Sequence, residues 1–180
     1  NYEPAWSETL MFTLEKYVKS DLVLLLLDDF FISNNVDEIT IKKCIEIMTE
    51  KNYSNITLTN HDSSRISHRT DCSLLNKIDD KSPYRITNSP SLWKKSSLKK
   101  DLRADESIWI VEIFGSRRSY RIKDSFYKVN ESEISDGFGE VIPYFQGVDD
   151  TGIVKGKWQV GIDKLFESSG IEVDYNKRGF

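Results

Sequence analysis

The chain has 180 residues, of which 38% are hydrophobic and 30% are charged, a balance typical of one globular domain with a buried core. Its formal net charge of -4 argues against nucleic acid as a bulk partner, because binding to phosphate backbones needs a basic surface. Two cysteines are too few for a disulfide framework, so the composition indicates a reducing, cytoplasmic compartment.

The first elements predicted are a helix and a buried strand. Apolar residues recur at helical spacing over 6–19, and an unbroken apolar run follows over 22–27. A run without alternation predicts a central strand that is buried on both faces, as in parallel α/β sheets. No strand precedes the helix, so we expect this α/β unit to be incomplete at its front.

The rest of the chain continues the alternation of helices and strands. The elements predicted are, in order, a helix over 36–51, a strand over 55–59, a long polar loop over 60–82, a short strand over 84–87, a helix that begins at Ser89-Pro90, a helix over 105–118, a strand over 125–129, a turn over 136–139, a strand over 140–145, a flexible Gly-rich loop over 147–157 and a helix over 158–168. This order predicts a single α/β domain over 1–180, with a mixed, Rossmann-like sheet flanked by helices.

Two acidic residues, Asp28 and Asp29, follow the apolar run. In open α/β sheets ligands bind beyond the carboxyl ends of the strands, and two adjacent carboxylates in a dry place repel each other unless a cation lies between them. Mg²⁺ or Mn²⁺ binds through one or two carboxylates together with substrate phosphates. The alternative is that the pair caps a turn into Phe30-Phe31.

The residues around this pair resemble the acidic metal motif of GT-A type glycosyltransferases. The similarity lies in the sequence Leu24-Leu-Leu-Leu-Asp-Asp-Phe-Phe-Ile32. Further pieces are similar to bacterial glycosyltransferases of capsule and lipopolysaccharide O-chain synthesis: Ser91-Leu-Trp-Lys-Lys95, Trp109-Ile-Val-Glu112, Phe114-Gly-Ser116 and Gly152-Ile-Val-Lys-Gly-Lys-Trp158. The resemblance implies a GT-A-like fold that lacks its nucleoside-binding β-α-β segment at the front.

Glu112 lies between two apolar residues in the predicted helix over 105–118. A carboxylate in apolar surroundings has a raised pKa, which suits a general base that takes a proton from a sugar hydroxyl. The resemblance places Glu112 where inverting enzymes of this type carry their catalytic carboxylate. The alternative is a surface residue that pairs with Arg117 or a lysine.

Five further residues are candidates for binding. Trp93 and Trp109 have aromatic faces that stack on sugar rings, although their helical spacing favours core packing for at least one of them. Arg117 is a candidate for substrate phosphate or for a surface ion pair. Lys155 and Lys157 flank a glycine in the loop 147–157, where the resemblance implies a segment that folds over the diphosphate; ordinary solvated lysines are the alternative.

The sequence therefore predicts a metal-dependent glycosyltransferase that uses a nucleotide-sugar donor and a glycan or lipid-linked acceptor. A lipid-linked acceptor implies peripheral association with the inner face of the cell membrane. The alternative function is a non-catalytic or Mg-dependent phosphate-binding α/β domain. A response-regulator receiver fits less well, since its acidic pair lies at the first strand, and a haloacid-dehalogenase phosphatase needs Asp-x-Asp where this chain has Phe30.

Overall fold

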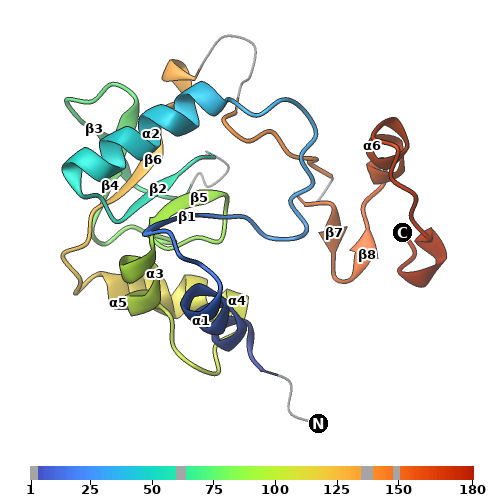
Figure 1. Ribbon diagram of the computed structural model, residues 1–180, viewed down its shortest axis with the longest axis horizontal. Helices are drawn as coiled ribbons and strands as arrows, with labels where there is room; N and C mark the ends of the chain where they lie inside the picture. Colours follow the sequence, from blue (N-terminus) through green and yellow to red (C-terminus); the bar gives the residue numbers. More distant parts are fainter. Residues whose placement is uncertain (1–3, 60–63, 135–139, 148–150) are drawn as a thin grey trace.

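The computed structural model describes residues 4–59, 64–134, 140–147 and 151–180. It has an α/β architecture, in which helices cover both faces of a mixed six-stranded sheet and a small lobe at the C-terminal end stands beside the sheet (Figure 1). The predicted class, a mixed sheet flanked by helices, is confirmed. No helix among the described residues is long and apolar enough to cross a membrane.

The helices and strands have the following bounds. The helices are α1 (Trp6–Lys16), α2 (Glu38–Lys51), α3 (Lys95–Asp101), α4 (Ile108–Ile110), the π-helix η1 (Val111–Gly115), α5 (Ser116–Ser119), α6 (Ile162–Ser168) and the 3-10 helices η2 (Glu131–Glu133) and η3 (Tyr175–Lys177). The strands are β1 (Leu22–Leu25), β2 (Asn55–Thr57), β3 (Ser67–Arg69), β4 (Leu75–Ile78), β5 (Ser91–Lys94), β6 (Phe126–Val129), β7 (Ile153–Val154) and β8 (Lys157–Trp158).

The six-stranded sheet has the order β1-β5-β2-β6-β4-β3. Strand β5 is antiparallel to both of its neighbours, β1 and β2, whereas β2 and β6 are parallel. Strands β4 and β3 extend the sheet as an antiparallel pair. Because β1, β2 and β6 run in one direction, their carboxyl ends lie at the same edge of the sheet.

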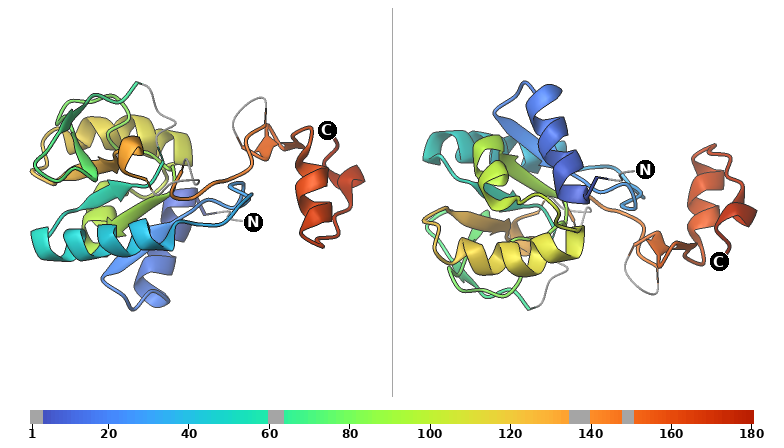
Figure 2. Two further views of the ribbon diagram at one scale, coloured as in Figure 1. Left: turned by 90° about the horizontal axis from the view of Figure 1, so that it is seen from above. Right: turned by 90° about the horizontal axis from the view of Figure 1, so that it is seen from below.

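Two hydrophobic clusters hold the layers together, one on each face of the sheet. Figure 2 shows the helices that cover these two faces. Along β5, Leu92 belongs to the cluster under α2, and Trp93 belongs to the cluster that α1, α3 and η1 cover. Successive residues of a strand point to opposite faces of the sheet, so the side chains of β5 are buried on both faces. Asp37 is the N-cap of α2, and its carboxylate accepts hydrogen bonds from Thr40 N (3.0 Å) and Thr40 Oγ1 (2.7 Å).

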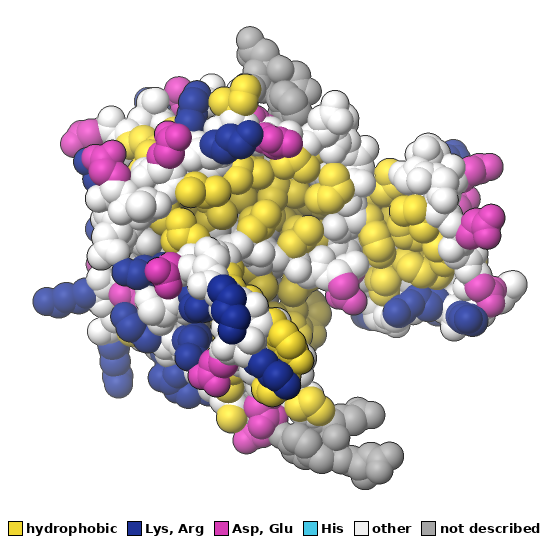
Figure 3. Space-filling model, in the orientation of Figure 1, with side chains coloured by type: hydrophobic (Ala, Val, Ile, Leu, Met, Phe, Trp, Pro, Cys, Tyr) yellow, Lys and Arg dark blue, Asp and Glu magenta, His cyan; other side chains and the backbone are white. Residues whose placement is uncertain are grey.

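Strand β1 lies at an edge of the sheet, so the prediction that it is central and buried on both faces is wrong. It pairs with β5 on one side, and no other described strand pairs with it. Leu24 is 47% exposed and Leu26 is 37% exposed. Figure 3 shows apolar side chains gathered over this edge, between α2 and α1. A continuous apolar run therefore predicts a strand, but it reports neither burial on both faces nor the position of the strand within the sheet.

Three further predictions fail in the middle of the chain. The segment 60–82, predicted as a polar loop, contains the antiparallel pair β3 and β4, in which Leu75 and Ile78 are buried and His68, Arg69 and Lys77 are exposed. Ser89-Pro90 does not begin a helix, because the next four residues form β5 between β1 and β2, and the helix α3 starts only at Lys95. The predicted strand over 84–87 is an irregular segment that leads into β5.

Outcomes elsewhere are mixed. The helices predicted over 6–19, 36–51 and 105–118 and the strands predicted over 55–59 and 125–129 are confirmed, with shorter bounds. The predicted strand over 140–145 is reduced to one isolated bridge, Ile32↔Tyr144. The loop 147–157 contains β7 and the start of β8, and the last helix begins at Ile162 rather than Trp158. The turn predicted over 136–139 lies outside the described residues.

A charged cluster is buried beneath α3 and α5. The side chain of Arg85 is fully buried, donates to the backbone oxygens of Ser119 and Asp124, and pairs with Asp80 at 3.0 Å. Asp101 is 1% exposed, and neither oxygen of its carboxyl group has a hydrogen-bond partner among the described residues. Burial and the nearby Asp124 carboxylate raise the pKa of Asp101 to about 7, against opposing effects of Arg118, Arg85 and Arg103.

We expect Asp101→Asn to remove a pH dependence of stability. The pKa of Asp101 in the folded chain is raised from 3.8 to about 7, so its stabilising contribution is fully present below pH 3.8 and is lost as the pH rises through 7. At pH 8 the free energy of unfolding of the variant should be a few kcal/mol higher than that of the parent chain. At pH 4 the two free energies should be similar. Urea denaturation across this pH range measures the difference, and a constant offset at all pH values would contradict the prediction.

Candidate functional site

The candidate site lies at the edge of the sheet where β1, β2 and β6 end. The register pairs Leu25 with Ser91, Ser91 with Thr57, and Thr57 with Lys128. The segments 26–37, 58–59 and 84–90 all meet the sheet at this edge. In α/β sheets, the carboxyl edge is where loops gather around a ligand.

Asp28 and Asp29 lie in a turn at this edge, three and four residues after β1 ends. Phe30 N donates to Leu27 O at 3.3 Å and closes the turn. Asp28 is exposed, whereas Asp29 is half-buried and its Oδ1 atom is shielded from solvent. The expectation that both acids sit at the dry tip of a strand is therefore wrong, since solvent reaches Asp28 and the turn extends beyond the sheet.

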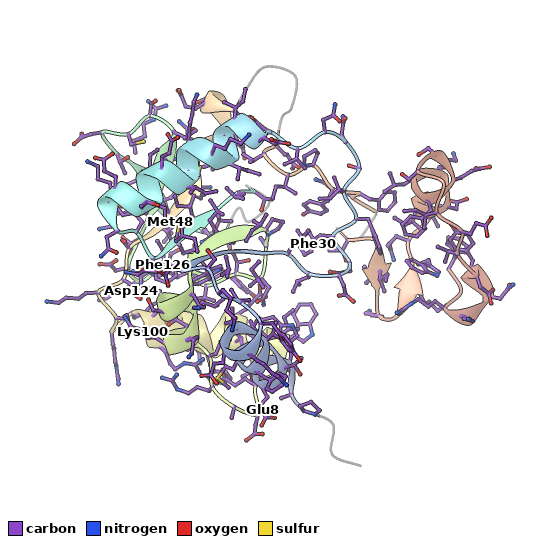
Figure 4. All side chains as sticks on the ribbon, viewed as in Figure 1. Glu8, Phe30, Met48, Lys100, Asp124 and Phe126 are labelled. Carbon is purple, nitrogen blue, oxygen red and sulfur yellow. The ribbon has the colours of Figure 1, made fainter. Side chains whose placement is uncertain are left out.

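The acidic turn is held between the sheet and the C-terminal lobe, residues 151–180. Phe30 packs edge-on against Tyr144 with ring centroids 4.6 Å apart, and Figure 4 shows it in the segment between the sheet and the lobe. Phe31 enters the lobe, where its ring centroid lies 4.9 Å from that of Phe166 and 5.9 Å from that of Trp158. The two phenylalanines after the acids thus fix the position of the turn from outside the sheet.

Gly152 brings the start of the β7–β8 hairpin against the acidic turn. Its N–H donates to Asp29 O at 3.2 Å. A Cβ atom at Gly152 would lie 2.4 Å from Cδ2 of Phe31, so this close approach requires glycine. The hairpin that carries Lys155 and Lys157 therefore begins directly beside Asp29.

The two hairpin lysines have different surroundings. Lys155 is exposed in the turn between β7 and β8 with φ of +51°. Lys157 is also exposed, and its Nζ donates to Phe180 O at 3.1 Å. Of the two, Lys155 is the better placed for a ligand, since Lys157 is engaged with the end of the chain.

Glu112 belongs to η1, a π-helical turn between α4 and α5. Its Oε1 accepts hydrogen bonds from Asn88 N at 2.7 Å and from Thr87 Oγ1 at 3.3 Å. Segment 84–90 leads into β5, so these bonds place the Glu112 carboxylate at the same edge of the sheet as the acidic turn. The expectation of apolar surroundings is wrong, because the carboxylate faces a polar loop. π-helical turns of this kind are frequent at functional sites.

The remaining candidates differ in their exposure to solvent. Trp93 is 1% exposed and packs edge-on against Phe126, so it is a core residue and the prediction that it binds substrate is wrong. Trp109 is 71% exposed on α4. Arg117 is exposed on α5, and its guanidinium lies 5.6 Å from the centre of the Phe114 ring. Both Trp109 and Arg117 lie on the helical segment that carries Glu112.

Arg65 is a residue that the sequence did not single out. It is 6% exposed, and it donates from Nη1 to Thr57 Oγ1 at 2.9 Å and from Nη2 to Arg85 O at 3.1 Å. It thereby places a buried positive charge at the carboxyl end of β2. Its sequence neighbourhood is polar and irregular, so no local pattern marks it.

A cavity of about 440 Å³ lies in the C-terminal lobe, away from these residues. Its lining includes the acidic Asp163, Glu167 and Glu172 together with Tyr175. Carboxylates repel a phosphate-bearing ligand, so we do not assign this cavity to the candidate site. No group of three or more His, Cys, Asp or Glu side chains suitable for a metal ion occurs within the part of the chain that the structure describes.

Comparison with protein-family models, with curated proteins and with solved structures finds no match to this chain. The site residues therefore stand on their geometry alone.

We expect Phe31→Ala to loosen the lobe and leave the sheet intact. Truncation removes the contacts with Phe166 and Trp158, at a cost of about 2 kcal/mol for a partly buried ring. Hydrogen exchange should become faster in residues 151–180 and stay unchanged in β2 and β5. Phe12→Ala is the matched control, since Phe12 is 54% exposed on α1. Equal exchange in both variants would show that Phe31 does not hold the lobe.

Proposed function

We propose that this chain is a metal-dependent glycosyltransferase of the GT-A type. The reaction would move a sugar from a nucleotide-sugar donor to a glycan or a lipid-linked acceptor. The proposal is supported most by one observation: the acidic turn at Asp28 and Asp29 lies at the same edge of a mixed sheet as the loop 84–90, which donates hydrogen bonds to the carboxylate of Glu112. This edge is where α/β enzymes gather catalytic groups.

Asp28 and Asp29 would hold Mg²⁺ or Mn²⁺. The fit is that of an open site, since one acid is exposed, the other is half-buried, and two carboxylates leave room for water and phosphate oxygens. When bound, the cation would neutralise negative charge on the diphosphate leaving group. Lys155 lies on the hairpin that begins beside Asp29, and Arg65 lies at the end of β2, so both would add positive charge for the same phosphates.

Glu112 would act as the general base. Its second oxygen, Oε2, would accept the proton of an acceptor hydroxyl while Oε1 remains bonded to Asn88 N and Thr87 Oγ1. This anchoring fixes the carboxylate at the sheet edge. A single base opposite the leaving group corresponds to transfer with inversion.

A second candidate function is a phosphate-binding α/β domain without catalysis. It is favoured by Arg65, whose buried positive charge at the carboxyl end of β2 suits an anion. Such a domain would use the same acidic turn and basic residues but would not need Glu112. The two functions therefore separate at this residue.

We expect Asp28→Asn and Asp29→Asn to abolish cation-dependent binding of nucleoside diphosphates. Titration calorimetry with a panel of nucleoside diphosphates, with and without Mn²⁺, should show binding that Mn²⁺ strengthens at least tenfold in the parent chain. Asp163→Asn in the C-terminal lobe is the matched control and should bind like the parent. Binding that is indifferent to Mn²⁺, or unchanged in the two variants, would reject the metal site.

We expect Glu112→Gln to separate turnover from donor binding. The amide retains an oxygen for Asn88 N but cannot take a proton, so release of nucleoside diphosphate from nucleotide sugars should fall by roughly 10²–10⁴-fold. The cation-dependent binding measured by calorimetry should stay at the parent value. Loss of both would make Glu112 a structural residue, and a parent chain that binds but never turns over would favour the phosphate-binding function.

A further inference from the structure

The helical segment α4–η1–α5, residues 108–119, is apolar on both of its sides. Its inner side packs against the sheet through Val111, Gly115 and Ser119. Its outer side carries four large apolar residues in solvent: Trp109 (71% exposed), Ile110 (39%), Ile113 (44%) and Phe114 (48%). A surface helix normally presents charged and polar residues on its outer side. We call these four residues, with Arg117 and Arg121, the outer face.

The four apolar residues form one continuous strip. They lie at positions i, i+1, i+4 and i+5, so they share one side of the helix. Figures 1 and 2 show this segment on the outside of the molecule, on the face of the sheet opposite α2. A contiguous exposed apolar strip of this kind marks an interaction surface, whereas scattered apolar residues do not.

Basic residues continue the strip. Arg117 follows one turn after Ile113 and stacks on Phe114, with its guanidinium 5.6 Å from the ring centre, and Arg121 and Lys123 are exposed just beyond α5. Residues 94–128 contain 10 Lys and Arg against 5 Asp and Glu, a formal charge of +5, so the rest of the chain carries -9 of the total of -4. The chain is acidic overall, whereas the exposed residues Arg117, Arg121 and Lys123 next to the apolar strip are all basic.

We propose that the outer face binds the surface of an anionic lipid bilayer. A helix that lies in the membrane interface combines exposed Trp, Phe and Ile side chains with flanking Arg or Lys residues, because the apolar groups enter the acyl boundary and the basic groups contact lipid phosphates. Trp109, Ile113 and Phe114 supply the first set, and Arg117, Arg121 and Lys123 supply the second. A second copy of the chain is the poorer occupant, because a two-fold contact would bring this basic surface against itself.

This surface also orients the candidate site. Glu112 lies on the same helical segment, between the buried inner side and the outer face. With the outer face on a membrane, Glu112 would stand close to the lipid headgroups, where a lipid-linked acceptor presents its sugar. This consequence rests on the proposed function, but binding to the bilayer does not, so the two are tested separately.

Vesicle flotation without donor or metal tests the membrane surface. The parent chain should float with vesicles in which phosphatidylglycerol replaces about a third of the phosphatidylcholine, and it should bind at least tenfold less to phosphatidylcholine alone. Trp109→Ser with Phe114→Ser should lower partitioning at least tenfold. Ile39→Ser on α2, where Ile39 is 61% exposed on the opposite face of the sheet, is the matched control and should bind like the parent.

Charge variants give a second, independent readout. Arg117→Gln and Arg121→Gln should each weaken binding to anionic vesicles roughly fivefold and reduce its salt dependence, whereas Lys42→Gln on α2 should not. Circular dichroism confirms that each variant is folded. Binding that ignores lipid charge, or that survives loss of Trp109 and Phe114, would overturn the proposal. So would a parent chain that stays off vesicles and instead dimerises through Trp109, as sedimentation velocity would show.

Discussion

Strand β5 is the constraint on which the rest of the structure depends. It is inserted antiparallel between β1 and β2, so its hydrogen bonds decide that Leu25, Ser91 and Thr57 lie side by side. This register brings the loop after β1, the loop after β2 and the loop before β5 to a single edge. Without β5, no strand would place the acidic turn and the loop that binds Glu112 at the same edge of the sheet.

Contacts made outside the sheet hold the side chains of the candidate site at this edge. In the loop before β5, Asn88 N and Thr87 Oγ1 donate hydrogen bonds to Glu112 Oε1. The π-helical turn η1 places Glu112 where it can accept both bonds. On the other side of the edge, Phe31 reaches into the C-terminal lobe and fixes the acidic turn through aromatic packing. One catalytic candidate is thus held by hydrogen bonds and the other by apolar contacts made outside the sheet.

The helical segment α4–η1–α5 has different surroundings on its two sides. Its inner side completes the core beneath the sheet, and its outer side combines exposed apolar residues with arginines. A single short segment therefore belongs to the core, to the candidate site and to the proposed membrane surface. Residues on its inner side therefore act on the core, residues on its outer side act on the proposed membrane surface, and Glu112 lies between them.

The sequence by itself determined the elements whose signal is local. Periodicity placed helices at 36–51 and 105–118, the apolar run placed a strand at 22–27, and the acids after that strand marked the edge where the candidate site lies. Only the tertiary structure decided that β1 is an edge strand, that residues 91–94 form a strand, that Trp93 is buried and that Arg65 joins the site. The physical reason is that strand position and burial depend on partners distant in sequence. Helical spacing and a continuous apolar run, in contrast, predict the secondary structure of a segment from residues that are close together in the sequence.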